Sequence, residues 1–464
     1  MFVSAHASVR NMRIHFIAIG GAAMHNLAVA LQQKGDIITG SDDEIKEPSR
    51  SRLAAHGLLP EKMGWFPEKL NSEIDIVILG MHARPDNPEL QEAKRLGLKI
   101  CSFPEYLFQQ TRDKMRVVIS GSHGKTTITA MVLYVLHKMN IRFDYLIGAQ
   151  VEGFDAMLSL NEETRIAIFE GDEYLTSVID KRPKFHIYQP HIAVISGIEW
   201  DHIDAFPTFE NYIEQFRTFS QMIERDGKLI YPEGDEQIMQ ITESIREDIT
   251  DMPYHTPEYS IDGGVSTLKT KYGEFPLKIF GEHNMQNIEA ARLICRQIGV
   301  KDADFYEAIA TFKGLPGRME KIAEGTDAAA YYDMAHTPSN VKVSIHALKA
   351  QFPGRKVIAC LELCSFSSLS SGYLPQYRNS LNEADVAFVY FNPNVHCYKH
   401  RIPITEEMVK EVFGEKVTVF TDNIKLMDRV SLEKVQNTNL LFMTSGSFSG
   451  MNMAGFAKNL LKKG

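Results

Sequence analysis

Residues 116–127 read RVVISGSHGKTT, an apolar run followed by two glycines, a lysine and two threonines. The run predicts a buried strand, and the apolar periodicity of residues 128–139 predicts a helix after it. Glycines between a strand and a helix let backbone N–H groups face a phosphate, and a following lysine neutralises phosphate oxygens. The glycines stand two residues closer together than in the common phosphate-binding loop. We predict a nucleotide site made by Gly121, Ser122, His123, Gly124, Lys125, Thr126 and Thr127.

Apolar, strand-like runs alternate with helical patterns on both sides of this loop. They cover 13–20, 36–40, 74–80 and 99–103, then 166–170, 192–197 and 228–231, and finally 328–333, 356–362, 385–391, 416–420 and 439–444. Buried strands that alternate with helices form parallel sheets covered on both faces. We therefore predict an α/β fold with a Rossmann-like N-terminal domain (1–108), a P-loop mononucleotide-binding central domain (109–316) and a Rossmann-like C-terminal domain (317–464).

The composition excludes several classes of function. Among 464 residues, 59 are acidic and 50 basic, a net charge of −9 that argues against a nucleic-acid coat or an anionic-membrane binder. No apolar run is long enough to predict membrane insertion. Five widely spaced cysteines and no apolar signal segment predict a cytoplasmic enzyme with reduced thiols, here expected as a monomer or weak dimer.

Carboxylates follow two of the predicted central strands. FEGDEY (169–174) and WDHID (200–204) both stand where strand ends should meet at the mouth of one sheet. A carboxylate and a neutral imidazole there, together with Thr126, have the chemistry to bind Mg²⁺. Solvated acidic loops are the alternative interpretation of either segment alone.

The motif series along the chain resembles the Mur ligase family of ATP-dependent amide ligases of peptidoglycan synthesis. It comprises GSHGKTT, EGDEY, WDHID, GEHNMQN (281–287), Gly317-Arg318 and DMAHTP (333–338). The resemblance implies ATP and Mg²⁺, with Lys125 on the phosphates and Thr126, Glu170 and His202 on the metal. Whether Glu173 is a direct ligand stays open. It also implies that His283 and Asn287 read the adenine, Arg318 reaches the phosphates, Asp333 binds the ribose, and His336 lies near the reacting groups.

The N-terminal IAIGGAAM (17–24) and Gly40-Ser41-Asp42 resemble the domain of this family that binds UDP-N-acetylmuramate. The resemblance implies that Gly20, Gly21 and Ala22 hold the diphosphate, although Ala18 replaces a usual glycine, and G-x-G-x-x-G is absent. Ser41 and Asp42 are expected at the ribose or base, or else in a plain turn. His82 and Arg84 follow the third strand and are expected to face the sugar.

Two amine substrates remain open within this branch of the family. The stretch EYLTSVIDKRPKFHIYQP (173–190) is similar to members that attach L-alanyl-γ-D-glutamyl-meso-diaminopimelate in peptidoglycan recycling, so Asp180, Lys181 and Arg182 are expected to contact substrate. L-alanine is the alternative. In the third domain, Ser365 and Ser445 are expected at the amine substrate; SGSFSG (445–450) is predicted to open a helix, and Cys364 stands where the family often has His or Arg.

Three other hypotheses are weaker. A folate-type polyglutamate ligase would not need the N-terminal glycine turn. A non-catalytic nucleotide-binding regulator would not need Lys125, Glu170, His202 and Asp333 intact. A structural zinc site would use Cys360, Glu362 and Cys364 with His396, Cys397 and His400, but no C-x₂-C pair supports it.

Overall fold

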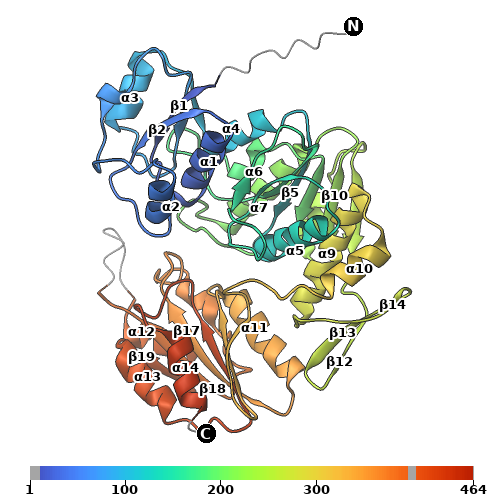
Figure 1. The fold of residues 1–464 in the computed structure, drawn as a ribbon. Helices are drawn as coiled ribbons and strands as arrows, with labels where there is room; N and C mark the ends of the chain where they lie inside the picture. Colours follow the sequence, from blue (N-terminus) through green and yellow to red (C-terminus); the bar gives the residue numbers. More distant parts are fainter. Residues whose placement is uncertain (1–10, 395–403, 463–464) are drawn as a thin grey trace.

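The computed structural model describes residues 11–394 and 404–462, and its N-terminal unit is built on a four-stranded parallel sheet in the order β2-β1-β3-β4. The glycine turn after β1 leads directly into α1, so this helix begins at the carboxyl edge of the sheet (Figure 1). The elements are β1 (Arg13–Ile17), α1 (Ala22–Gln33), β2 (Ile37–Ser41), α2 (Ser49–Ala55), η1 (Pro67–Lys69), β3 (Ile76–Leu79), α3 (Pro88–Arg95), β4 (Ile100–Ser102) and α4 (Phe103–Gln110).

The central unit contains a seven-stranded sheet in the order β11-β10-β9-β5-β8-β6-β7, in which only β6 and β7 pair antiparallel. β5 lies in the middle, and its side chains alternate between two cores: Val117 and Ile119 face α5 and α9, while Val118 faces α7. The strands are β5 (Met115–Ser120), β6 (Asp144–Leu146), β7 (Leu158–Ser159), β8 (Ile166–Glu170), β9 (Ile192–Ile195), β10 (Lys228–Pro232) and β11 (Thr250–Tyr254). The helices are α5 (Lys125–Lys138), α6 (Lys184–Ile187), α7 (Phe209–Gln221), α8 (Glu236–Thr242), α9 (Glu282–Ile298) and α10 (Asp302–Ile309).

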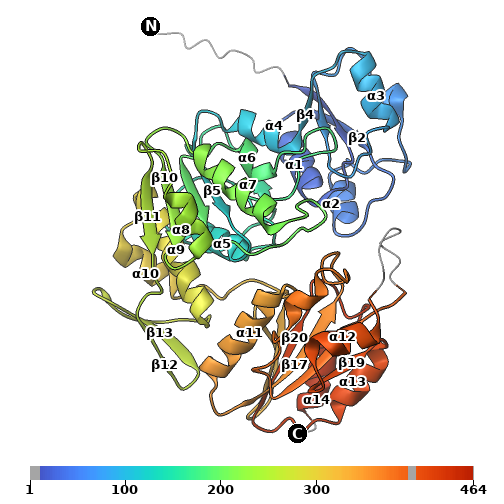
Figure 2. The ribbon, with the colours of Figure 1, turned by 180° about the vertical axis from the view of Figure 1, so that it is seen from behind.

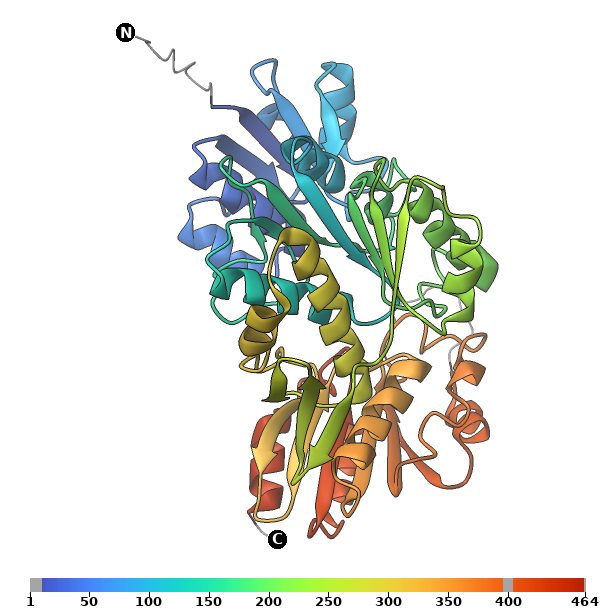
Figure 3. The same ribbon diagram turned by 90° about the vertical axis from the view of Figure 1, so that its right-hand side faces the viewer.

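A small antiparallel sheet of β12 (Tyr259–Asp262), β13 (Val265–Thr270) and β14 (Gly273–Pro276) extends from the central unit. Figure 3 shows it beside α11 (Pro338–Gln351) of the C-terminal unit. Ser266 Oγ donates to Gln351 Oε1 at 2.9 Å, and Gln351 Nε2 donates to the Gly264 carbonyl at 2.7 Å. The hairpin therefore joins the two units at a point away from the nucleotide loop.

The C-terminal unit has a six-stranded sheet in the order β15-β16-β20-β17-β18-β19, with only β15 antiparallel to its neighbour. Its carboxyl edge faces the central unit, as the view from behind also shows (Figure 2). The elements are β15 (Glu320–Glu324), β16 (Ala329–Asp333), β17 (Lys356–Leu363), η2 (Leu374–Tyr377), β18 (Val386–Phe391), α12 (Glu406–Phe413), β19 (Val417–Phe420), α13 (Asn423–Ser431), β20 (Thr438–Met443) and α14 (Met453–Leu461).

One apolar core runs without a break from the N-terminal sheet to the α7 face of the central sheet, whereas the C-terminal unit has its own cores. The predicted α/β class with three parallel-rich sheets is confirmed. The predicted boundaries stay predictions; residue 108 lies within α4, and residue 316 lies between α10 and β15. Within the described residues, no helix is long and apolar enough to cross a membrane.

Candidate active site

The nucleotide loop connects β5 to α5, so the amino end of α5 points into a cavity of about 780 Å³. Gly121 and Gly124 have positive φ angles of 123° and 76°, which favour glycine. A Cβ atom on Gly121 would lie 2.4 Å from Ser196 Oγ, and one on Gly124 would lie 2.5 Å from Asn287 Oδ1. Only glycine therefore fits at these two positions, and the loop presents its backbone N–H groups to an anion.

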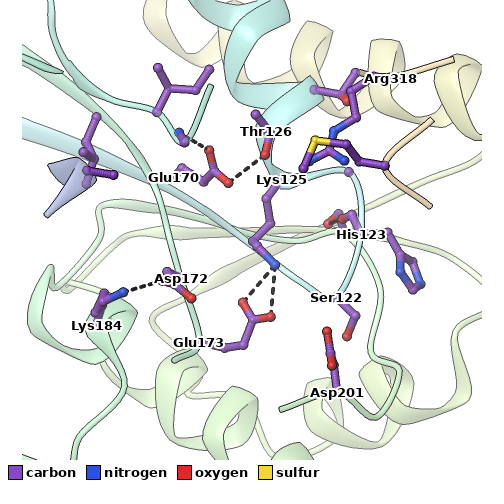
Figure 4. Close-up of a pocket in the computed structure, with 18 of the residues that line it drawn as sticks. Ser122, His123, Lys125, Thr126, Glu170, Asp172, Glu173, Lys184, Asp201 and Arg318 are labelled. Atoms are coloured by element: carbon purple, nitrogen blue, oxygen red, sulfur yellow. Dashed lines mark hydrogen bonds and ion pairs between the residues drawn. The ribbon is translucent and has the colours of Figure 1, made fainter. Parts of the chain in front are cut away.

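Lys125 is the first residue of α5, and its ammonium group reaches the middle of the cavity (Figure 4). It donates to the Gly121 carbonyl at 2.6 Å and lies 2.9 Å from Glu173 Oε2. Burial disfavours the charged amine, but Glu173 outweighs it and raises the pKa of Lys125. The same pairing outweighs burial at the carboxylate and holds the pKa of Glu173 well below its usual range. Both groups are charged, and phosphate would share Lys125 with Glu173.

Two oxygen donors meet beside this lysine. Thr126 Oγ1 donates to Glu170 Oε1 at 2.7 Å, and the Gly148 N–H donates to Glu170 Oε2 at 2.7 Å. Burial raises the pKa of Glu170 despite these two bonds. A hydroxyl and a carboxylate oxygen beside a phosphate loop are suitable ligands for Mg²⁺. The positive charge of the ion would stabilise the ionised form of the buried Glu170.

His202 lines the same cavity but contacts Glu173, with its Nε2 3.5 Å from Glu173 Oε1. Burial opposes protonation, but Glu173 and Asp201 outweigh it and raise the pKa of His202 to about 9. A protonated imidazole cannot ligate a cation, so metal binding through His202 requires the loss of that proton. Its role as a ligand stays a prediction. The described residues contain no cluster of three or more His, Cys, Asp or Glu side chains arranged to hold a metal.

Two histidines in the cavity have buried ring nitrogens without a hydrogen-bond partner: His123 Nδ1 and His283 Nδ1. Burial lowers the pKa of His283 to about 4, so its ring is neutral at physiological pH. Asn287 lies one helical turn further along α9, and its amide donates to Asn284 Oδ1 at 3.4 Å. These unsatisfied or weakly satisfied polar groups fit a nucleotide base that supplies the missing partners.

The C-terminal unit contributes three of the predicted residues to the cavity: Arg318, Asp333 and His336. Asp333 ends β16 and accepts a hydrogen bond from Ser344 Oγ at 2.6 Å, and burial raises its pKa. The His336 ring bonds the Met334 carbonyl through Nδ1 at 2.8 Å. The cavity therefore spans all three units. Sixteen predicted site residues line it: Gly21, Ala22, His82, Ser122, His123, Gly124, Lys125, Thr126, Thr127, Glu170, His202, His283, Asn287, Arg318, Asp333 and His336.

Other predicted residues support the cavity or lie away from it. Asp42 Oδ2 accepts the Gly20 N–H at 2.7 Å and so braces the glycine turn, while Ser41 Oγ accepts from Lys69 at 3.0 Å. Arg84 pairs with Asp86 on the surface. Their predicted substrate contacts stay predictions.

The Asp180–Arg182 segment does not reach the cavity either. Arg182 pairs with Asp180 at 2.6 Å and with Glu105 of α4 at 3.5 Å, and Lys181 is exposed, because the segment forms the tip of a hairpin. This segment braces the central unit against the N-terminal unit.

Two predicted residues of the C-terminal unit lie outside the cavity lining. Ser365 bonds Ser368, and Ser445 lies 3.4 Å from Cys364 Sγ. The prediction that 445–450 opens a helix is wrong, because α14 begins at Met453 with its N-terminus capped by Asn452. Of the proposed zinc ligands, His396, Cys397 and His400 lie outside the described residues.

Several lining residues were not predicted as site residues, including Asp172, Lys184, Glu199 and Asp201. Three of them stand in or beside the acidic motifs, which was an available signal. Lys184 stands in the stretch 173–190 quoted above, but its place in the cavity depends on the closure of the hairpin.

Comparisons with known proteins agree with this geometry. Residues 13–114 match the model of the Mur ligase family, catalytic domain, and residues 119–295 match that of the Mur ligase middle domain. The UDP-N-acetylmuramate–L-alanyl-γ-D-glutamyl-meso-2,6-diaminoheptandioate ligase of Escherichia coli is 27% identical, over 96% of this chain and 99% of its own. The UDP-N-acetylmuramate–L-alanine ligase of Carboxydothermus hydrogenoformans is 30% identical, over 74% of each chain.

Solved structures of the same family have a similar fold. A crystal structure of a murein peptide ligase from Psychrobacter arcticus superposes with a TM-score of 0.64 at 23% identity, over 97% of this chain and 98% of that one. With a phosphate loop, acidic strand ends and a cavity shared by three α/β units, this chain belongs to the Mur ligase family and is an ATP-dependent amide ligase.

Proposed function

We propose that this ligase joins the carboxylate of UDP-N-acetylmuramate to the amine of L-alanyl-γ-D-glutamyl-meso-diaminopimelate in peptidoglycan recycling. The observation that carries the proposal is the extent of the similarity. The Escherichia coli relative that bears this activity in its name aligns with 96% of the chain, whereas L-alanine ligases of the family align with between 74% and 92% of it. A cytoplasmic location and a monomer or weak dimer belong to the same proposal, and fractionation and sedimentation test them.

The proposed reaction has two steps. A carboxylate oxygen of the sugar attacks the γ-phosphorus of ATP, and ADP leaves. The peptide amine then attacks the carbonyl carbon of the acyl phosphate, loses a proton, and phosphate leaves. Both steps move negative charge between oxygens, so the site needs fixed cations and N–H donors rather than a covalent nucleophile.

The residues of the cavity suit these steps. The N–H groups of the nucleotide loop and Lys125 would hold the phosphates, Asn287 and His283 would bind the base, and Asp333 would accept from the ribose. Arg318 approaches from the C-terminal unit, so closure of that unit would complete the phosphate site.

The charge balance of the cavity supports Mg²⁺ as the cofactor. Six carboxylates line it, against three lysine or arginine side chains. Thr126 and Glu170 would hold the ion, with His202 as a candidate after deprotonation. Mg²⁺ bound there would offset the negative charge of ATP among these carboxylates.

One assay tests the proposal. Phosphate release is measured with ATP, Mg²⁺ and UDP-N-acetylmuramate, with either the tripeptide or L-alanine as the amine. We expect release to require the sugar nucleotide and to favour the tripeptide. A preference for L-alanine would overturn the choice of amine.

A pair of variants tests the nucleotide site. Lys125→Ala should abolish most of the release, whereas Lys138→Ala, at the far end of the same helix, should not. Full activity of Lys125→Ala would refute the assignment of the phosphate site.

A further inference from the structure

Three lysine or arginine side chains line the cavity: Lys125, Lys184 and Arg318. Lys125 belongs to the nucleotide loop, and Arg318 comes from the C-terminal unit. Lys184 has no role in the reaction as proposed so far. Figure 4 shows it paired with Asp172, on the opposite side of Lys125 from Arg318.

A hairpin between β8 and α6 places Lys184 in the cavity. Leu175 and Pro183 form a β-bridge, and the Thr176 N–H donates to the Arg182 carbonyl at 2.9 Å. The Lys184 N–H then donates to the Tyr174 carbonyl at 3.0 Å. The chain thus leaves the sheet at the acidic motif and returns to it ten residues later, with Lys184 as the first residue of α6.

The pair with Asp172 fixes the direction of the lysine side chain. Lys184 Nζ lies 2.5 Å from Asp172 Oδ2, while Asp172 Oδ1 accepts the Tyr174 N–H at 3.0 Å. Burial opposes ionisation of Asp172, but Lys184 outweighs it and lowers the pKa of the carboxyl. An ammonium group has three N–H donors, and Asp172 takes one of them. Two donors remain for a ligand, and 24% of the lysine side chain is exposed.

The surroundings of Lys184 indicate which ligand this would be. The N-terminal unit contributes Gly80, Met81 and His82 after β3, and Phe103 and Pro104 at the start of α4, to the same cavity. α6, which Lys184 begins, packs against α4 of that unit. Lys184 therefore lies on the side of the cavity where the N-terminal unit meets the phosphate loop. A carboxylate carried by a ligand of the N-terminal unit would pass this point to reach the γ-phosphate of a nucleotide bound at the loop.

A cation at that point would favour the approach of a negatively charged substrate. A substrate carboxylate that approaches the loop enters beside Glu170, Asp172 and Glu173, which repel it. Lys125 is shared between Glu173 and the phosphates. The protonated ring of His202 is paired with Glu173, so Lys184, beside Asp172, is the lysine that the central unit offers to this part of the cavity.

We propose that Lys184 binds the carboxylate of the sugar nucleotide and holds it in line with the γ-phosphate, with Asp172 as its positioning residue. This inference rests on the proposed function. In the first step a carboxylate oxygen forms the bond to phosphorus, the bond from phosphorus to the β–γ bridging oxygen breaks, and ADP takes the electron pair. No proton of Lys184 moves; its charge orients the carboxylate before transfer.

The test compares Lys184→Met, which keeps the length of the side chain without its charge, with Lys184→Arg. Acyl phosphate formed from ATP and UDP-N-acetylmuramate, without amine, is trapped with hydroxylamine, and KM is measured for each of the three substrates. We expect Lys184→Met to raise KM for the sugar nucleotide or lower the rate of trapping by about 10- to 100-fold. KM for ATP should stay within twofold, and Lys184→Arg should recover part of the loss.

A matched control is available in the C-terminal unit. Lys349 and Asp385 also lie 2.5 Å apart, with side-chain exposures of 28% and 39% against 24% and 40% for Lys184 and Asp172. Lys349 does not line the cavity, so Lys349→Met removes a comparable ion pair and should leave all three KM values unchanged.

Other results of these measurements would contradict either this inference or the proposed function. If Lys184→Met equals the wild type in sugar KM and trapping, or changes only the KM for peptide or for ATP, the inference is wrong. If the wild type forms no acyl phosphate from the sugar nucleotide, the proposed function fails instead. The double variant Lys184→Met/Asp172→Asn leaves no unpaired charge, and it should show the same loss with a normal melting temperature.

Discussion

Replacement of Gly124 by alanine should separate backbone strain from nucleotide binding. Gly124 has a φ of 76°, and its α-carbon faces the side chain of Asn287. A methyl group there would lie 2.5 Å from Asn287 Oδ1, so the amide must move away from the loop. The variant therefore strains the phosphate loop and displaces the residue expected to bind the adenine.

The two effects differ in what they change. A residue with a Cβ in the left-handed region costs about 1–2 kcal/mol, and the free protein carries this strain, so it lowers stability rather than affinity. Displacement of Asn287 removes up to two hydrogen bonds to the base, each worth about 0.5–1.5 kcal/mol. We expect ATP to bind about 10- to 100-fold more weakly.

Calorimetric titration with ATP and Mg²⁺, together with thermal unfolding, measures both effects. Gly153→Ala is the control, because Gly153 has a φ of 88° with no atom within 4 Å of the added methyl group. It should lose comparable stability and keep its ATP affinity. Wild-type ATP affinity in Gly124→Ala, or an equal loss of affinity in Gly153→Ala, would refute this reasoning.

Three further predictions concern titratable groups and the contact between units. Because burial lowers the pKa of His283 to about 4, its ring should stay neutral between pH 5.5 and 8. A plot of the KM for ATP against pH should therefore have the same shape for His283→Asn as for the wild type over that range. Burial opposes ionisation of Glu89, but its hydrogen bond to His15 outweighs burial and lowers the pKa of the carboxyl. The contribution of Glu89 to the free energy of unfolding should therefore be complete above about pH 4.5 and lost as the pH falls below that value. In urea unfolding measured against pH, Glu89→Gln should weaken the dependence of that free energy on pH in the acidic range. The Tyr373 hydroxyl donates to the Trp200 carbonyl at 3.0 Å, between the C-terminal and central units. Tyr373→Phe should therefore weaken the contact between these units by about 1 kcal/mol, which X-ray scattering would detect as a larger radius of gyration. An unchanged radius of gyration together with an unchanged KM for ATP would contradict this prediction.

Local sequence was sufficient to predict the elements that carry the nucleotide loop. The apolar run before Gly121 and the periodic segment after Lys125 are contiguous, so a short-range pattern identified both β5 and α5.

Contacts between distant segments could not be predicted in this way. The packing of Gly124 on Asn287 depends on α9 lying against α5, and the sequence does not state that angle. Lys184 reaches the cavity only because backbone hydrogen bonds close a hairpin around the Asp180–Arg182 tip. Near Ser445, serines and glycines resemble a helix start, but Asn452 caps the helix instead.

The position of β5 in the central sheet also has a consequence for synthesis of the chain. β5 pairs with β8 and β9, and the Ser122 N–H donates to the carbonyl of Gly197, which follows β9. The loop therefore cannot take its final shape until residue 197 has left the ribosome. At roughly 5–20 residues per second, that is about 4–15 s after the loop itself is made. During this interval the nascent N-terminal unit can fold, but the growing chain has no nucleotide site, so ATP can stabilise only chains in which the central sheet has closed.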